Sequence, residues 1–332
     1  MYWSASIRSG STRFLVNKSH PLRGYFYIAA ATLLWGLSAT LGRGAFTGRF
    51  FPPGESIGSI DPTILSQSRT TFSFLVLFPI LWLRRGGTAL RLPKRDAWRV
   101  AMLGVLGVAS SNYLYYLAIE KTNVATAIVL QYTAPVMVLV YMVARGKQRA
   151  TLKRVSAVGL AVIGSAFAIG FGGSNGLSLN PVGVAAALLA AVAFSYYNVA
   201  GHELLGHYDH WLVLLYTTLS AAVFWLFVNP PWRVVAAHYS ASEWGFLLLF
   251  AMTSALLPFA FYFAGLQYLE PTRAIVVSCL EPVFSIMIAA LVLSETVRAL
   301  QALGIVVVLA GIVLVQIPEL GEKPARIIEP IE

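Results

Sequence analysis

Long apolar segments recur along the whole chain, and they limit what it can fold into more than any other feature. Ten stretches of mainly apolar residues are separated by short connectors rich in Gly, Pro and charged residues. About 20 such residues form a helix that spans the hydrocarbon core of a bilayer. Only 11% of the 332 residues are charged, against about 25% in soluble domains. The sequence predicts an all-α membrane protein whose ten transmembrane helices lie at 25–46, 62–83, 97–118, 122–144, 152–171, 181–201, 211–228, 243–266, 271–293 and 299–317.

The basic residues predict how these helices are oriented. Most of the 24 Lys and Arg lie in 1–24, 84–99 and 145–154. Short loops rich in Lys and Arg stay on the cytoplasmic side, so both termini are predicted to be cytoplasmic and the chain to lie in the cell (inner) membrane. The net charge of +10 then gives no reason to expect a nucleic-acid partner. An organelle transit peptide is the alternative interpretation of residues 1–24.

The two halves of the chain resemble each other. When the first half is shifted by 147 residues, 115–136 falls on 262–283, and Pro135 meets Pro282. Because each half has an odd number of spans, five, the two halves are predicted to cross the membrane in opposite orientations. Secondary transporters with such inverted repeats have their site where the repeats meet. The predicted organisation is a basic cytoplasmic tail (1–24), a five-helix repeat (25–171), an external joint (172–180), a second five-helix repeat (181–317) around a shared central cavity, and a cytoplasmic tail (318–332).

Two motifs carry a resemblance to a known family. "AATLLWGLSA" in the first span and "LEPVFSIMIAALVLSETVRALQALGIVVVLAGIVLV" at the end resemble the EamA-type branch of the drug/metabolite transporter superfamily, over residues 25–317. The resemblance implies two inverted repeats around a cavity lined by spans 1, 3, 4, 6, 8 and 9. It also implies transport of a small metabolite, with amino acids, nucleosides and drugs among the family's substrates. Export is the direction that this analogy favours.

Glu281 and Pro282 stand side by side within the ninth span. A carboxylate at the centre of a span costs about 2.5–3.5 kcal/mol on insertion scales, and such residues mark functional sites. Proline removes a backbone donor. Glu281 is predicted either to bind substrate or a proton, or to serve a structural or gating role by bonding backbone amides at a helix break at Pro282.

Polar and aromatic side chains cluster in the middle of the predicted spans. They are predicted to bind substrate, with Trp35 at the cavity wall, and hydrogen bonding between packed helices is the alternative. Together with Glu281, the predicted substrate-binding residues are Trp35, Asn112, Tyr116, Gln131, Tyr132, Tyr197, Asn198 and Tyr262.

Arg69 lies inside the second span. It is predicted to form an external gate, and snorkelling to the membrane surface or pairing with Asp61 or Glu55 is the alternative. His202, Glu203, His207, Asp209 and His210 resemble a metal-binding cluster only loosely and fit a solvated cytoplasmic loop better.

The function predicted from these features is secondary transport of a small polar or aromatic metabolite by alternating access. No cofactor, metal or catalytic residue is expected, and the expected partners are the metabolite, membrane lipid and, as a candidate coupling ion, the proton. A lipid or lipid-linked sugar flippase, a membrane enzyme and a scaffold remain as alternatives.

Overall fold

Every regular element that the structure describes is helical. The computed structural model describes residues 21–46, 60, 62–122, 124–170, 180–293 and 296–317. The first half, residues 21–170, contains α1 (Pro21–Phe46), α2 (Pro62–Ala89), α3 (Lys94–Met102), η1 (Leu103–Ala109), α4 (Ser110–Lys121), α5 (Val124–Gln131), α6 (Ala134–Ala144) and α7 (Leu152–Ala168). The second half, residues 180–317, contains α8 (Pro181–Leu205), α9 (His210–Val228), α10 (Pro231–Ala236), α11 (Ala241–Ala251), η2 (Met252–Leu256), α12 (Leu257–Leu266), α13 (Pro271–Ser278), α14 (Leu280–Leu293) and α15 (Ala299–Gln316). The predicted external joint, and nearly all of both predicted tails, lie outside the described residues.

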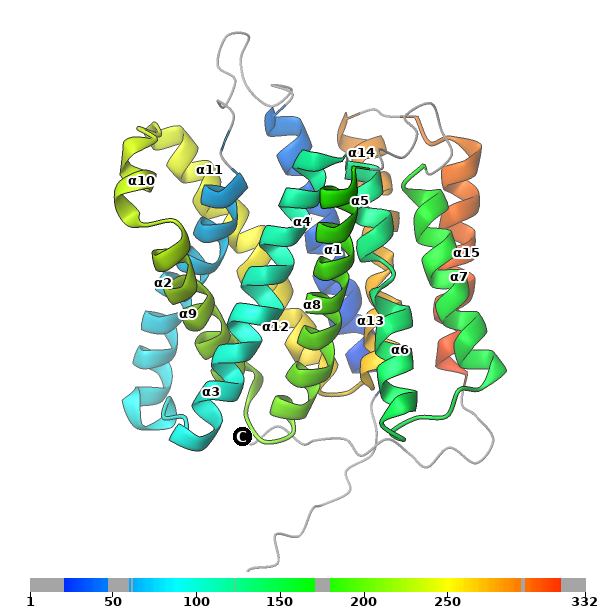
Figure 1. Cartoon of the computed structure of the whole chain (residues 1–332), viewed down its shortest axis with the longest axis horizontal. Coiled ribbons are helices and arrows are strands. Elements are labelled where there is room, and N and C mark those ends of the chain that lie inside the picture. Colours follow the sequence, from blue (N-terminus) through cyan, green and yellow to red (C-terminus); the bar gives the residue numbers. More distant parts are fainter. Residues whose placement is uncertain are drawn as a thin grey trace, which may run out of the picture.

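The helices run side by side in one bundle (Figure 1). Among the described residues, eight helical segments are long and apolar enough to cross a membrane: Thr63–Ala89, Lys94–Lys121, Thr126–Ala144, Pro181–Leu205, His210–Val228, Ala241–Leu266, Pro271–Val292 and Ala299–Gln316. Helix α1, with 26 residues, and α7, with 17, coincide with the two other predicted spans but are not among these eight.

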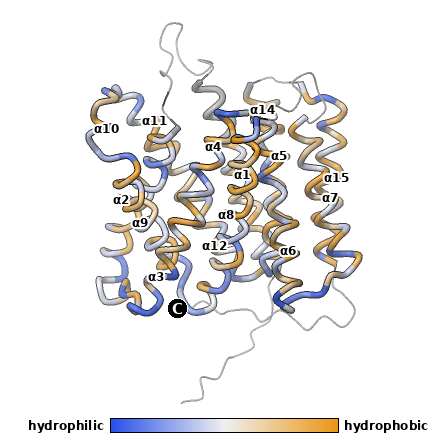
Figure 2. The backbone as a smooth tube through the Cα atoms, in the orientation of Figure 1, coloured by the Kyte–Doolittle hydropathy of each residue, from blue (hydrophilic) through white to orange (hydrophobic). Residues whose placement is uncertain are grey.

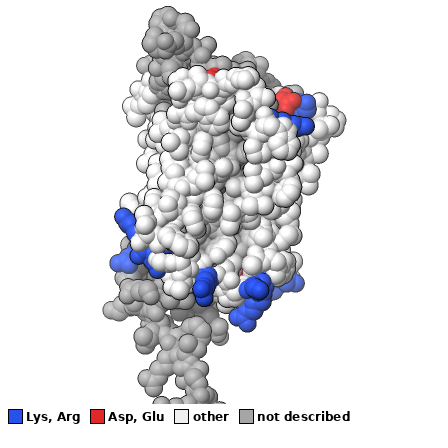
Figure 3. All heavy atoms as spheres, turned by 90° about the vertical axis from the view of Figure 1, so that its left-hand side faces the viewer, with Lys and Arg blue, Asp and Glu red and all other residues white. Residues whose placement is uncertain are grey.

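The outside of the bundle is apolar. Leu83, Phe227 and Leu291 are each more than 80% exposed, and apolar residues cover the middle of most helices along their length (Figure 2). A soluble protein buries such side chains, whereas lipid tails solvate them. Figure 3 shows that Lys and Arg on one face gather mainly near the lower end of the molecule and leave its middle uncharged. The turns α2–α3, α6–α7, α8–α9 and α12–α13 lie at this lower end, which we call the basic end (Figure 1).

Local sequence signals set where the helices begin. Pro181, Pro231 and Pro271 each occupy the first position of a helix, where the missing N–H costs no helical hydrogen bond. The Asn180 side chain accepts from the backbone N–H of Val182 at 3.0 Å and so caps α8. These signals fix the ends of the helices that carry the site.

Four irregularities interrupt the long helices at matching places in the two halves. The π-helical segments η1 and η2 end at Ala109 and Leu256, which are 147 residues apart. The break between α5 and α6 begins at Tyr132, and α13 and α14 are separated by Cys279, again 147 residues further along. A π-helical segment frees backbone carbonyls from the usual ladder and is frequent at functional sites.

Helix α7 of the first half packs closely against α15 of the second, with small residues at the contact. A Cβ atom built on Gly304 would lie 2.7 Å from the carbonyl oxygen of Gly164, and one on Gly311 would lie 2.9 Å from that of Ala157. Such distances leave no room for a side chain, and small residues allow this close backbone approach in membranes.

Candidate functional site

The π-helical segment η2 supplies a carbonyl that ties three helices together. The Ser254 carbonyl oxygen accepts from Arg69 Nη2 at 2.6 Å and from Trp35 Nε1 at 3.1 Å. These donors come from α2 and α1 in the first half, while Ser254 belongs to the second. Trp35 and Arg69, which are 34 residues apart, are thereby held at one point of the interface between the halves.

Arg69 is the centre of a polar cluster that reaches the third span. Its Nη1 donates to Asn112 Oδ1 at 3.2 Å and to the Tyr116 hydroxyl at 3.1 Å. The guanidinium also lies over the Phe250 ring, 5.9 Å from its centroid, a favourable cation–π arrangement. Arg69 is only 7% exposed, so it does not snorkel to the surface. Asp61 and Glu55, the other predicted partners, lie outside the described residues.

Glu281 and Tyr132 connect the two helix breaks. The Tyr132 hydroxyl, where α5 ends, donates to Glu281 Oε2 at 3.0 Å in the first turn of α14. Pro282 occupies the same first turn, where its missing N–H leaves the helical ladder intact. Within the described part of the chain, the side-chain hydrogen bond of Glu281 therefore goes to a phenol across the interface and not to a backbone amide at the break.

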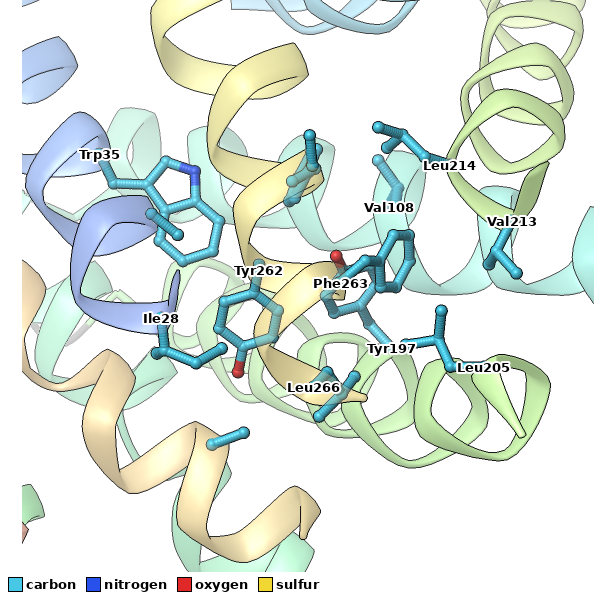
Figure 4. Packing of buried hydrophobic residues seen from close by; sticks show 14 of the residues in the cluster. Ile28, Trp35, Val108, Tyr197, Leu205, Val213, Leu214, Tyr262, Phe263 and Leu266 are labelled. Atoms are coloured by element: carbon cyan, nitrogen blue, oxygen red, sulfur yellow. The ribbon is translucent and has the colours of Figure 1, made fainter. Parts of the chain in front are cut away.

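A third group of the predicted residues lies inside a packed aromatic cluster. Figure 4 shows Trp35, Tyr197, Tyr262 and Phe263 packed together in the bundle core. Ring centroids lie 5.4 Å apart for Trp35 and Tyr262, and 5.0 Å apart for Tyr197 and Phe263. The Tyr262 hydroxyl donates to Asn198 Oδ1 at 2.5 Å. In this conformation the rings contact one another, so a ligand reaches them only when the cluster opens.

The sequence did not single out every residue of these clusters. Ser254 and Phe250 contact Arg69, yet nothing in "LLLFAMTSALLPF" identifies a π-helical segment. Gln131, which was predicted to bind substrate, is half-buried, and its side chain makes no hydrogen bond with any described residue.

An apolar groove lies on the outer surface between α3 and α9, away from all of these clusters. Its volume is about 470 Å³, and its lining residues are Ala97, Ala101, Val105, Tyr216, Leu219, Ser220, Val223, Phe224 and Phe227. No predicted site residue lines it.

Ion pairs join the two halves at the basic end. In each pair the cation comes from the first half and the anion from the second: Arg85–Asp209 at 2.6 Å, Arg99–Glu203 at 3.7 Å, Lys147–Glu203, and Arg154–Glu270 at 3.6 Å. We call these four pairs the interhalf clamp. Two members of the predicted solvated loop, Glu203 and Asp209, are therefore held in ion pairs. Among the described residues, no three His, Cys, Asp or Glu side chains could hold a metal ion together.

Hydrogen bonds shift the pKa of one clamp residue and of its neighbour. Burial alone would raise the pKa of Asp209, but hydrogen bonds from His210 and Arg85 outweigh it and hold the pKa at about 2, below the ordinary 3.8. Partial burial and a hydrogen bond to Asp96, 2.5 Å long, raise the pKa of Tyr208. Asp209 is therefore ionised at neutral pH.

Comparison with known proteins agrees with this architecture. The chain is 22% identical to the "Uncharacterized inner membrane transporter YicL" of Salmonella typhimurium, over 89% of this chain and 95% of that protein. It is 25% identical to the "Threonine/homoserine exporter RhtA" of the same species, over 67% of this chain and 72% of that protein. A solved structure, titled only as the crystal structure of a protein, matches with a TM-score of 0.69 at 19% identity, covering 88% of this chain and 95% of that one, which shows a shared fold.

The EamA-like transporter family matches this chain twice, over residues 22–170 and again over 181–317. These two matches cover most of the chain. The protein is a multi-pass membrane transporter that belongs to the EamA-like transporter family.

Proposed function

We propose that this protein is a secondary transporter that exports a small polar or aromatic metabolite, such as an amino acid, by alternating access. The observation that carries the proposal is the set of buried polar contacts between the halves. Arg69 and Tyr132 of the first half contact Ser254 and Glu281 of the second. Polar and ionisable groups inside a membrane are costly and concentrate along substrate and ion pathways.

Ten spans in two inverted repeats form the proposed scaffold. The separate family matches to the two halves support it, and so do the π-helical segments and helix breaks that recur 147 residues apart. The packing supports it as well, because α1 packs against α12, α13 and α14, while α8 packs against α4, α5 and α6. Exchanging the halves leaves this pattern of neighbours unchanged.

The proposed orientation places the basic end in the cytoplasm. Lys and Arg gather there (Figure 3), as the positive-inside rule expects. Helix α1 begins at this end and α15 finishes at it (Figure 1), so the chain would enter and leave the bundle on the cytoplasmic side of the inner membrane.

The proposed transport cycle opens and closes the basic end. The interhalf clamp holds the halves together there, so the described conformation would be closed toward the cytoplasm. Opening would separate each cation of the clamp from its anion. Glu281 is the proposed coupling group, since its half-buried carboxyl group lies at the interface, bonded to Tyr132 of the other half, and could carry a proton or contact a substrate amine.

Two parts of the proposal, the export direction and the amino-acid substrate, are based on the similarity to RhtA, whose name describes a threonine and homoserine exporter. The test is metabolite profiling of medium from overexpressing cells, followed by flux of the identified metabolite in proteoliposomes. We expect the exported metabolite to move down its gradient only in vesicles that contain the protein. Identical profiles with and without the protein would overturn the proposal.

The groove between α3 and α9 favours one second candidate, a lipid flippase, because an acyl chain fits an apolar groove that faces lipid. Fluorescent phospholipid scrambling in the same proteoliposomes tests this candidate. Movement of lipid without movement of any soluble metabolite would replace export with lipid translocation.

A further inference from the structure

Arg69 is a buried cation, and none of the described residues is an anionic partner for it. It is 93% buried, and among the described residues no carboxylate lies within ion-pair distance of it. Its acceptors are an amide oxygen, a phenol and a backbone carbonyl, all neutral. A buried charge normally has a partner of opposite charge, because neutral groups do not replace the hydration that it loses.

Two hydrogen-bond donors in this cluster are also unused. Arg69 Nε and Asn112 Nδ2 are fully buried and have no hydrogen-bond acceptor among the described residues. A guanidinium has five N–H donors, and the three hydrogen bonds of Arg69 leave Nε–H and one Nη2–H without an acceptor. Buried polar atoms are otherwise almost always satisfied, so the cluster is short of one acceptor that carries negative charge.

We propose that Arg69 and Asn112 form a carboxylate-binding site, so that the substrate carries a carboxylate. This inference rests on the proposed transport function and names the substrate's chemical class. The Nε and Nη2 edge of a guanidinium matches the two oxygens of a carboxylate. Asn112 Nδ2 supplies a further donor to the same anion.

The charge balance favours a carboxylate over a phosphate, which presents the same oxygen geometry. The cluster offers one positive charge, and among the described residues the charge of Arg69 acts on the carboxyl group of Glu281. A monoanion neutralises Arg69, whereas a dianionic phosphate would leave uncompensated negative charge in a membrane interior. Glu281 and the Tyr132 hydroxyl then remain to bind a positive or polar group on the same substrate.

The experiment uses the full-length protein in detergent. Two ligand pairs test the carboxylate: L-phenylalanine and its α-amide, and L-threonine and its α-amide. Inorganic phosphate and uridine are the competing ligand classes. Thermal-shift titration measures binding to the wild type, Arg69→Gln, Asn112→Asp and Arg233→Gln. The last variant is the matched control, because Arg233 is an exposed arginine on α10. Asn112→Asp is nearly isosteric and places a resident carboxylate beside Arg69, so it tests the site without leaving the guanidinium unpaired.

We expect a free amino acid to bind and its amide to bind roughly 10- to 100-fold more weakly, which is the loss of a charge-assisted hydrogen bond. Arg69→Gln and Asn112→Asp should weaken amino-acid binding by a similar factor. Asn112→Asp should in addition melt at a higher temperature than the wild type without ligand, and Arg233→Gln should bind normally. Equal binding of acid and amide, stronger binding of phosphate or uridine, or unchanged binding in Asn112→Asp would each overturn the proposal.

Metabolite profiling separates this inference from the transport proposal beneath it. Export of a metabolite that has no carboxylate would overturn the carboxylate site and leave the transport function standing. Profiles that do not respond to the protein would overturn both. Export of a carboxylate compound that is lost in Arg69→Gln and kept in Arg233→Gln supports both.

Discussion

Breaking one ion pair of the interhalf clamp should open the basic end by a predictable amount. Asp209→Asn removes the anion that accepts from Arg85 at 2.6 Å. The difference between a pKa of about 2 and the ordinary 3.8 corresponds to about 2.4 kcal/mol. Part of this comes from His210, which lies in the same half and stays beside Asp209 when the halves separate. Arg85 is 38% exposed, so water screens the pair further. About 1 kcal/mol is left for the contact between the halves, roughly a fivefold change in the ratio of open to closed molecules.

Distances between spin labels at positions 88 and 207 measure this ratio. Thr88 and His207 are both exposed, one in each half beside the clamp. In a Cys279→Ser background, Asp209→Asn should raise the ratio of wide to narrow distances about fivefold. The charge reversal Arg85→Asp with Asp209→Arg should restore the wild-type distribution. The matched control is Arg95→Gln, because Arg95 pairs with Asp96 inside one half at 3.3 Å, and it should change nothing.

The pKa of Asp209 fixes the direction in which pH changes the ratio of open to closed molecules. Asp209 has a lowered pKa in the closed state, and this pKa rises toward 3.8 when the Arg85 contact opens, while His210 stays beside Asp209. Its stabilisation of the closed state is therefore complete above pH 3.8 and is lost as the pH falls toward 2. Between pH 5 and pH 7 the distance distribution should stay constant. A shift within that range, or an unchanged distribution in Asp209→Asn, would refute the reasoning.

Three further predictions concern other parts of the molecule. If Glu281 couples transport to protons, Glu281→Gln should abolish the pH dependence of flux in proteoliposomes, and a normal pH profile would exclude this role. Gly304→Ala should lower the stability by about 1–3 kcal/mol, since overpacking costs that much, and thermal unfolding in detergent should show it. Gly245→Ala, where an added Cβ meets nothing within 4 Å, should melt normally in the same assay. Asn175→Cys, at the predicted external joint, should react with a membrane-impermeant thiol reagent added outside the cell, and labelling only from inside would contradict the ten-span topology.

The all-helical membrane fold could be predicted from the sequence because twenty-residue apolar runs have few other stable arrangements. The sequence also singles out Arg69 and Glu281 as candidates, since charge within an apolar run is rare. Their partners were not. Ser254 contacts Arg69 from within the π-helical segment η2, and one extra residue in a helical turn leaves no mark on the hydrophobic pattern. The break at Tyr132 was missed as well. Pro135 follows it by three residues and falls in the first turn of α6, so the proline does not mark the position of the break itself.

The charge distribution of the clamp has a consequence for how the chain can change. All four cations come from one half and all three anions from the other. Like charges on both sides of this contact would repel each other. The two halves are therefore complementary at the basic end, and a substitution that reverses one charge there has to be matched by a second reversal on the other half.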